Sequence, residues 1–268
     1  MKLAALALGL ALGLPLAGPA APAPPAGGLN AADLARVGVR APPGAALPLG
    51  LAMRDDAGRP TTLGGAVDGE PTVLVFADYA CTTLCGPALS MTAAGLTASR
   101  LAPGRDFRVA VIGLDPNSTA AQAQAFRHSR LDGEPALSAA STLMTGSAGA
   151  IAQATAAVGY GYVRDPASGQ YTHPAVAFVL QPTGRVSRVL SQIGLRGEDL
   201  RLALVEAGQG RVGSLVDRLN LLCHGFDPAR GVYDNLVQGW LRVGGVATVL
   251  LMAGGLAALS LKRRRAAA

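Results

Sequence analysis

Two cysteines, Cys81 and Cys85, lie four residues apart directly after the apolar run 71–77. Thiolates attack disulfides and bind soft metal ions, and the N-terminus of a helix stabilises the thiolate form. The apolar run predicts a buried strand, and helical spacing begins at Pro87, so the pair should lie at a strand-to-helix junction. This placement allows electron transfer, a metal site or an inert disulfide, and the spacing alone leaves all three open.

A third candidate ligand is His173, about 90 residues further along the chain, at the entrance to the apolar strand 175–180. In a thioredoxin-like domain, the loop before this strand faces the start of the cysteine-bearing helix. Two thiolates and one imidazole would form a small, soft, three-ligand site that suits copper. Zinc is the rival metal, but a structural zinc site normally takes four protein ligands.

The order of the predicted elements indicates how these residues are positioned. We expect, in chain order, a hairpin at 49–63, a strand at 73–77, a helix at 87–100, a strand at 107–114, a helix capped by residues 117–119, a helix at 147–157, strands at 176–180 and 186–190, and helices at 200–207 and 212–222. This order is typical of an α/β, thioredoxin-like domain with an insertion, predicted here at residues 47–210.

The cysteine and histidine segments resemble those of the Sco/SenC proteins, which are copper-binding assembly factors for cytochrome c oxidase. The resemblance depends on residues 76–85, a strand followed by Cys-x-x-x-Cys, and on residues 171–173 with 178–185, a histidine followed by a strand and a turn. It covers roughly residues 40–265. Residues 221–228, which lead into a terminal apolar span, are similar to the subgroup with a C-terminal membrane anchor.

The resemblance implies that Cys81, Cys85 and His173 are copper ligands. It implies a copper chaperone that assists assembly of the CuA site, with cytochrome c oxidase subunit II or another copper-site protein as partner. Two positions depart from the family pattern. Gly86 separates the second cysteine from Pro87, and Pro174 follows the histidine directly, which restricts that histidine to extended backbone geometry.

A thiol–disulfide oxidoreductase that reduces the CuA-site cysteines is the main alternative, and it would make the chain an enzyme. Cys81, nearer the strand and expected to be the more exposed thiol, would attack, and Cys85 would resolve the mixed disulfide. His173 would then be dispensable. A redox or copper sensor is a further, weaker alternative.

Both ends of the chain suggest export. We expect a signal peptide at 1–23, an Ala/Pro/Gly-rich leader at 24–46, a juxtamembrane segment at 211–239, a transmembrane helix at 240–261 and a basic cytoplasmic tail at 262–268. The main domain would then face the periplasm of a bacterium from its cytoplasmic membrane. Five of the positive charges behind the net +6 belong to Lys2 and the tail, so the body carries about +1, and we expect no nucleic-acid partner.

The remaining chemically distinctive residues have simpler interpretations. Cys223 and His224 are adjacent and point in different directions, so we expect both to be structural. Asp78 and Asp115 each follow a predicted strand, where they could orient the metal-binding side chains. Other residues with a predicted structural or surface role are Met91 and Met144, as core fillers, and His128, at a helix end.

Overall fold

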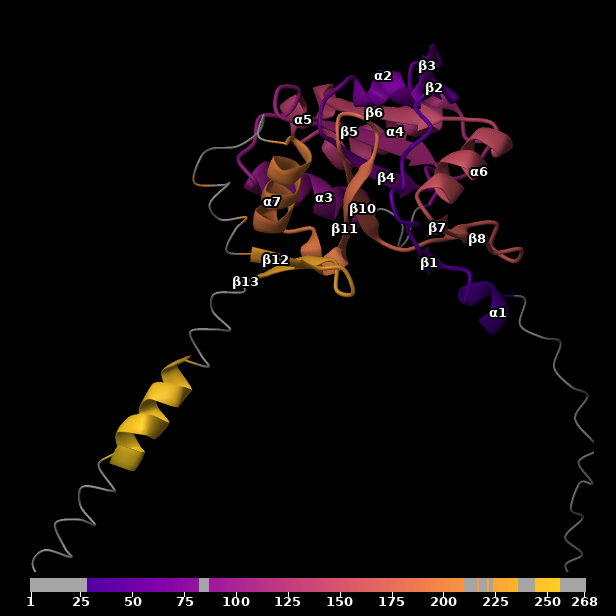
Figure 1. The fold of residues 1–268 in the computed structure, drawn as a ribbon. Helices are drawn as coiled ribbons and strands as arrows, with labels where there is room; N and C mark the ends of the chain where they lie inside the picture. The colour runs from indigo at the N-terminus through magenta and orange to yellow at the C-terminus, as the bar shows by residue number, and fades with distance from the viewer. Residues whose placement is uncertain are drawn as a thin grey trace, which may run out of the picture.

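A computed structural model describes residues 28–81, 87–209, 216, 221, 224–235 and 244–255. Its centre is a seven-stranded sheet in the order β11-β10-β4-β5-β6-β2-β3 (Figure 1). The strands of this sheet are β2 (Ala52–Asp55), β3 (Pro60–Thr62), β4 (Thr72–Ala77), β5 (Arg108–Gly113), β6 (Ser141–Thr145), β10 (Val176–Leu180) and β11 (Val186–Ser191).

Helices and three short strand pairs surround this sheet. The helices are α1 (Ala31–Leu34), α2 (Leu63–Val67), α3 (Pro87–Ala98), α4 (Ala120–Leu131), α5 (Pro135–Ala139), α6 (Ala148–Ala157) and α7 (Gly197–Ala207), with the 3-10 turn η1 (Gln192–Gly194). The antiparallel pairs are β1 (Gly38–Val39) with β7 (Tyr160–Gly161), β8 (Val163–Arg164) with β9 (Tyr171–Thr172), and β12 (His224–Asp227) with β13 (Val232–Asn235).

The strand pairing is that of a thioredoxin-like domain, as the element order predicted. β4 runs parallel to β5 and antiparallel to β10, and β10 in turn pairs antiparallel with β11. β6 extends the sheet beyond β5 as a further parallel strand, and the β2–β3 hairpin completes this end. The sequence analysis did not predict β6.

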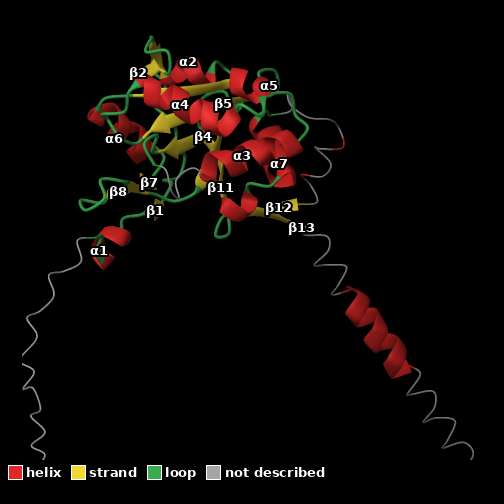
Figure 2. Ribbon diagram, turned by 180° about the vertical axis from the view of Figure 1, so that it is seen from behind, coloured by secondary structure: helices red, strands yellow, loops and turns green. Residues whose placement is uncertain are grey.

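Both faces of the sheet are covered by helices, which explains why all six residues of β4 are buried (Figures 1 and 2). Alternate residues of a strand point to opposite faces. Val73 and Val75 lie in the core beneath α3, α4 and α7, whereas Leu74 and Phe76 lie in a second core beneath α2 and α6. A continuous apolar run is therefore required at this central position.

Local sequence signals account for where two of the helices begin. Thr119 accepts a hydrogen bond from the Gln122 N–H while the Gln122 side chain bonds back to the Thr119 N–H, so α4 starts with a capping box. Ser147 caps α6 by accepting from the Ala150 N–H. The first predicted strand is displaced, because the chain forms a turn at Pro48–Leu51 and the strand starts only at Ala52.

The hairpin β12–β13 lies within the segment that we predicted as juxtamembrane, and it packs onto α7 and β11. The Tyr233 N–H donates to Asp199 Oδ1 (2.8 Å), and the Tyr233 hydroxyl donates to Glu206 Oε2 (2.6 Å). Arg188 of β11 also donates to Glu206, and its guanidinium lies 4.8 Å from the centre of the Phe226 ring. This cluster joins the hairpin to the edge of the sheet.

Several predicted segments at the chain ends lie wholly or partly outside the described residues. These are the signal peptide, part of the leader, most of the helix predicted at 212–222, residues 240–243 and 256–261 of the predicted span, and the basic tail. Residues 244–255 are helical. Within the described ranges, no helix has both the length and the apolar character needed to cross a bilayer.

Candidate metal centre

Cys81 lies in a tight turn that directly follows β4. Its backbone N–H donates to the Asp78 carbonyl (3.3 Å), and the Ala80 N–H donates to Asp78 Oδ1 (3.0 Å). Cys81 is only 4% exposed, which does not fit the accessible attacking thiol of the oxidoreductase alternative. That Cys81 is more exposed than Cys85 stays a prediction, because the described residues do not include Cys85. The turn closed by Asp78 keeps Cys81 inside the domain. Cys85 and its neighbours at 82–86 lie outside the described residues.

Tyr79 anchors this turn to the middle of the sheet. Its hydroxyl accepts from the Met144 N–H (3.1 Å) and lies within donating distance of the carbonyls of Met144 (2.9 Å) and Val111 (3.1 Å). Its ring also lies so close to Gly113 that a Cβ there would approach the ring to 2.7 Å. Burial strongly raises the pKa of the Tyr79 phenol, which therefore stays neutral.

His173 lies in the loop between β9 and β10, where Tyr160 orients its imidazole. The Tyr160 hydroxyl lies 2.8 Å from His173 Nδ1 and donates a hydrogen bond to the Pro174 carbonyl oxygen (3.0 Å). The same carbonyl oxygen lies 3.3 Å from His173 Nδ1. Because a carbonyl can only accept, these contacts assign the ring proton to Nδ1. Nε2 then carries the lone pair that could bind a metal.

The Nε2 atom of His173 is buried and has no hydrogen-bond partner within the described part of the chain. Burial lowers the pKa of His173, and the Pro174 carbonyl and the Asp78 carboxylate offset this only in part. The imidazole is therefore neutral at physiological pH. A neutral imidazole whose Nδ1–H is held by a neighbour is the form in which histidine ligates metals.

Asp78 connects the cysteine turn to the histidine loop. While Oδ1 holds the turn, Oδ2 accepts from the Tyr171 N–H (3.3 Å), two residues before His173. Asp78 is 2% exposed, and its charge acts on His173. The structure thus brings the segments of Cys81 and His173 together, and Asp78 supports both, as its position after the strand suggested.

Tyr160 is the residue of the candidate site that the sequence analysis missed. It belongs to the two-residue strand β7, and its ring stacks on Phe76 of β4 at 4.5 Å between centroids. The only local signal was an aromatic residue between two glycines, which does not indicate a histidine partner. Its role depends on a long-range contact with His173.

The other chemically distinctive residues lie elsewhere or have structural contacts. Asp115 accepts from the Asn117 N–H (2.9 Å) in its own turn, and the exposed His128 pairs with Asp132 (2.9 Å). Met144 is fully buried, and the partly buried Met91 packs against the core. His224 lies in β12, with its Nε2 4.0 Å from a carboxylate oxygen of Glu198. Cys223 lies outside the described residues.

The donors present fit a soft metal ion in part. A buried thiol at Cys81 and the unpartnered imidazole nitrogen of His173 are ligands that suit copper. The described residues hold no group of three or more His, Cys, Asp or Glu side chains arranged for a metal ion. The third predicted ligand, Cys85, lies outside this range.

No family model and no curated protein matches the sequence. Among solved structures, the fold is similar to a protein of Aquifex aeolicus VF5 described provisionally as an electron transfer protein, with a TM-score of 0.54 and 19% identity over 65% of this chain and 97% of that one. At this identity, the similarity shows that the fold is shared.

Two copper-bound structures are similar at lower scores. ScoI of Arabidopsis thaliana has a TM-score of 0.47 and 18% identity, over 57% of this chain and 95% of that one. ScoI of Bradyrhizobium japonicum has a TM-score of 0.46 and 20% identity, over 60% of this chain and 96% of that one.

Proposed function

We propose that this chain is a Sco/SenC protein that binds copper through Cys81, Cys85 and His173 and delivers it to the CuA site of cytochrome c oxidase. The observation that carries the proposal is the buried, unpartnered Nε2 of His173. A buried polar atom without a partner is costly, and a bound metal ion would satisfy it. Tyr160 already holds the opposite ring nitrogen in the required tautomer.

Copper is the cargo in this function, and its transfer is an exchange of ligands. The metal would leave two thiolates and an imidazole for the cysteine-rich site of subunit II, without a net change in its oxidation state. Soft thiolates favour Cu(I), and imidazole is a competent partner. Both cysteines must be reduced, because a disulfide between Cys81 and Cys85 would remove two of the three ligands.

The geometry weighs against the oxidoreductase alternative. A thiol that attacks a disulfide on another protein must be accessible, and reactive cysteines lie in partly exposed surroundings. Cys81 is only 4% exposed. That function would also leave the orientation of His173 by Tyr160 without a purpose.

The proposed location follows from the two chain ends. A signal peptide at 1–23 would export the domain, and a helix at 240–261 followed by the basic residues 262–265 would hold it at the outer face of a bacterial cytoplasmic membrane. This location would place the proposed copper site on the periplasmic side of the membrane, where the CuA site would receive the copper ion. Reporter fusions after residue 238 and after residue 268 should report opposite sides of the membrane.

An anaerobic copper titration of the full chain with reduced thiols tests the function. We expect one tightly bound copper ion per chain, and a sharp loss of affinity in each of the variants Cys81→Ser, Cys85→Ser and His173→Ala. His128→Ala is the matched control, because this exposed histidine lies on α4 and pairs with Asp132. Equal uptake by the wild type and His173→Ala, or no uptake by either, would contradict the proposal.

A further inference from the structure

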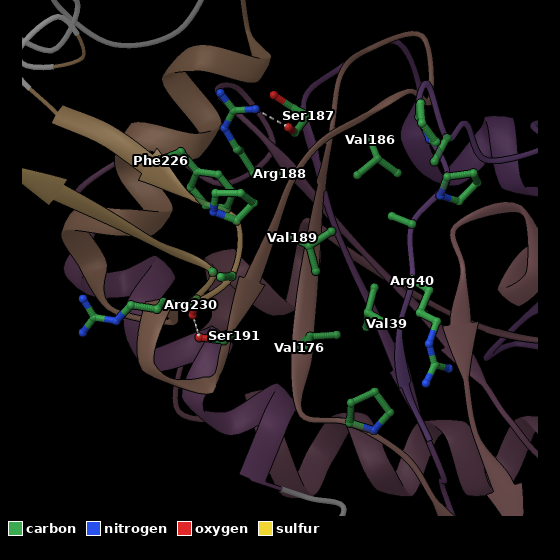
Figure 3. Close-up of a pocket in the computed structure, with 18 of the residues that line it drawn as sticks. Val39, Arg40, Val176, Val186, Ser187, Arg188, Val189, Ser191, Phe226 and Arg230 are labelled. Atoms are coloured by element: carbon green, nitrogen blue, oxygen red, sulfur yellow. Dashed lines mark hydrogen bonds between the residues drawn. The ribbon is translucent and has the colours of Figure 1, made fainter. Parts of the chain in front are cut away.

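A groove of about 900 Å³ runs beside the histidine loop (Figure 3). Residues 39–45 form one wall, and the β12–β13 hairpin, with Phe226 and residues 228–231, forms the other. Strands β10 and β11 form the floor. Pro174, the neighbour of His173, lines one part of the groove, and its carbonyl accepts from the hydroxyl that orients the imidazole. The groove therefore begins one residue from the proposed copper ligand.

The floor of the groove retains accessible apolar surface. Val176, Val186 and Val189 line it and are only partly buried, whereas every residue of β4, two strands away from the edge, is fully buried. Val39 and Phe226 add apolar surface at the two walls. A concave apolar surface bordered by polar side chains is typical of a protein-binding site.

The charged side chains of the groove all have the same sign. Arg40, Arg188 and Arg230 contribute to the lining, and no Asp or Glu occurs among the described residues that form it. The charge of Arg188 is balanced by Glu206, to which it donates a hydrogen bond. Arg40 lies on one wall, Arg188 on the floor and Arg230 on the other wall, so the lining is basic and complementary to an acidic ligand with an apolar side.

The hairpin wall is fixed in place, which favours binding. The Ser191 N–H donates to the Gly231 carbonyl (3.1 Å), and the Ser191 hydroxyl donates to the Arg230 carbonyl (2.6 Å). Gly231 has φ +63°, and a Cβ there would approach the Ser191 nitrogen to 2.7 Å, so only glycine permits this contact. A preformed groove lowers the entropy lost when a ligand binds.

We propose that this groove binds an extended, acidic segment of the protein that receives the copper. In an extended chain, successive side chains point to opposite sides, so apolar residues can face the valine floor while carboxylates reach the two arginines. This combination favours a polypeptide over an anionic lipid headgroup, which would leave the apolar floor uncovered. That the partner is the protein which receives the copper rests on the proposed function. That the groove binds an acidic peptide follows from its lining alone.

The test uses the purified full chain in a neutral detergent and a fluorescent ten-residue peptide in which Glu and Val alternate. We expect this peptide to bind, and a peptide with Gln in place of Glu to bind much more weakly. The double variant Arg40→Glu/Arg230→Glu should lose about tenfold in affinity, because two attractive exposed charge contacts become repulsive. Arg100→Glu, at an exposed arginine outside the groove, is the matched control and should bind as the wild type does.

Several outcomes would overturn the proposal. These are no binding of the Glu–Val peptide, equal binding of the Gln–Val peptide, equal loss in the Arg100 control, or arginine-dependent binding to anionic vesicles in place of the peptide. A parallel copper titration keeps the two proposals apart. Peptide binding without copper uptake would support the groove and contradict the proposed function, and copper uptake without peptide binding would do the reverse.

Discussion

The two segments that carry the candidate ligands are held by two tyrosines with different tasks. Tyr79 holds the cysteine turn by bonding main-chain atoms of β5 and β6 in the middle of the core. Tyr160 holds the histidine loop by bonding the imidazole itself and the carbonyl that follows it. The first arrangement fixes where a ligand lies, and the second fixes which nitrogen it presents. We therefore expect Tyr79 to contribute mainly to stability and Tyr160 mainly to metal binding.

The largest effect on folding should come from Tyr79→Phe. This change leaves buried main-chain groups of Val111 and Met144 without their partner, and we expect the free energy of unfolding to fall by about 2–3 kcal/mol. Urea unfolding measures this loss. The copper affinity of the folded chain should change by less than about twofold. A variant of unchanged stability and much weaker copper binding would reverse the roles that we give to the two tyrosines.

Tyr160→Phe should mainly affect copper. Without the hydroxyl, the Nδ1–H of His173 can donate only to the more distant Pro174 carbonyl, so the imidazole is less well oriented. We therefore expect the copper affinity to fall about tenfold. Competition with a chelator of known affinity measures this change. Tyr162→Phe is the control, because Tyr162 is a neighbouring, partly buried tyrosine whose hydroxyl faces Thr155. Equal losses in the two variants would indicate a general packing effect.

Asp78→Asn tests the connection between the two segments. The amide keeps one acceptor oxygen for the two N–H groups of Ala80 and Tyr171 and loses the charge, so we expect the free energy of unfolding to fall by about 1–2 kcal/mol. The Asp78 carboxylate raises the pKa of His173, so its neutralisation should lower that pKa further. NMR titration of the His173 ring would detect the shift. An unchanged or higher pKa would contradict the coupling.

The smallest expected effect is on the pH dependence of stability. Burial lowers the pKa of His173 in the folded chain below its ordinary value of 6.5, so the unfolded chain binds a proton first as pH falls. Stability should be complete above pH 6.5 and should decrease as pH falls from there through the folded pKa. Urea unfolding of the metal-free chain at pH 7.5 and pH 5.5 should show a smaller decrease for His173→Gln than for the wild type. The same decrease in both would exclude His173 as its source.

Local patterns in the sequence predicted the elements that depend on local physics. The continuous apolar run of β4 and the caps at Thr119 and Ser147 identified their elements because burial on both faces and unpaired helix N–H groups impose those residue types. The same patterns predicted that the loop of His173 approaches the cysteine turn, because a thioredoxin-like strand order requires it.

The remaining features depend on contacts between distant residues. The stacking of Tyr160 on Phe76 and the packing of β12–β13 on Glu206 join segments that are far apart in sequence. No spacing rule encodes such contacts. The groove is of this kind, since its two walls come from opposite ends of the domain.

The order of strands in the sheet also determines when the site forms. β4 and β10 are neighbours in space, but about 100 residues separate them in the chain, and contacts of such separation form late because a long loop must close first. The cysteine turn is synthesised well before His173 and Tyr160, since the chain emerges from the N-terminus. A folding intermediate without β10 would therefore present a thiol but no oriented imidazole. The time at which tight copper binding appears during refolding would then report when β10 pairs with β4.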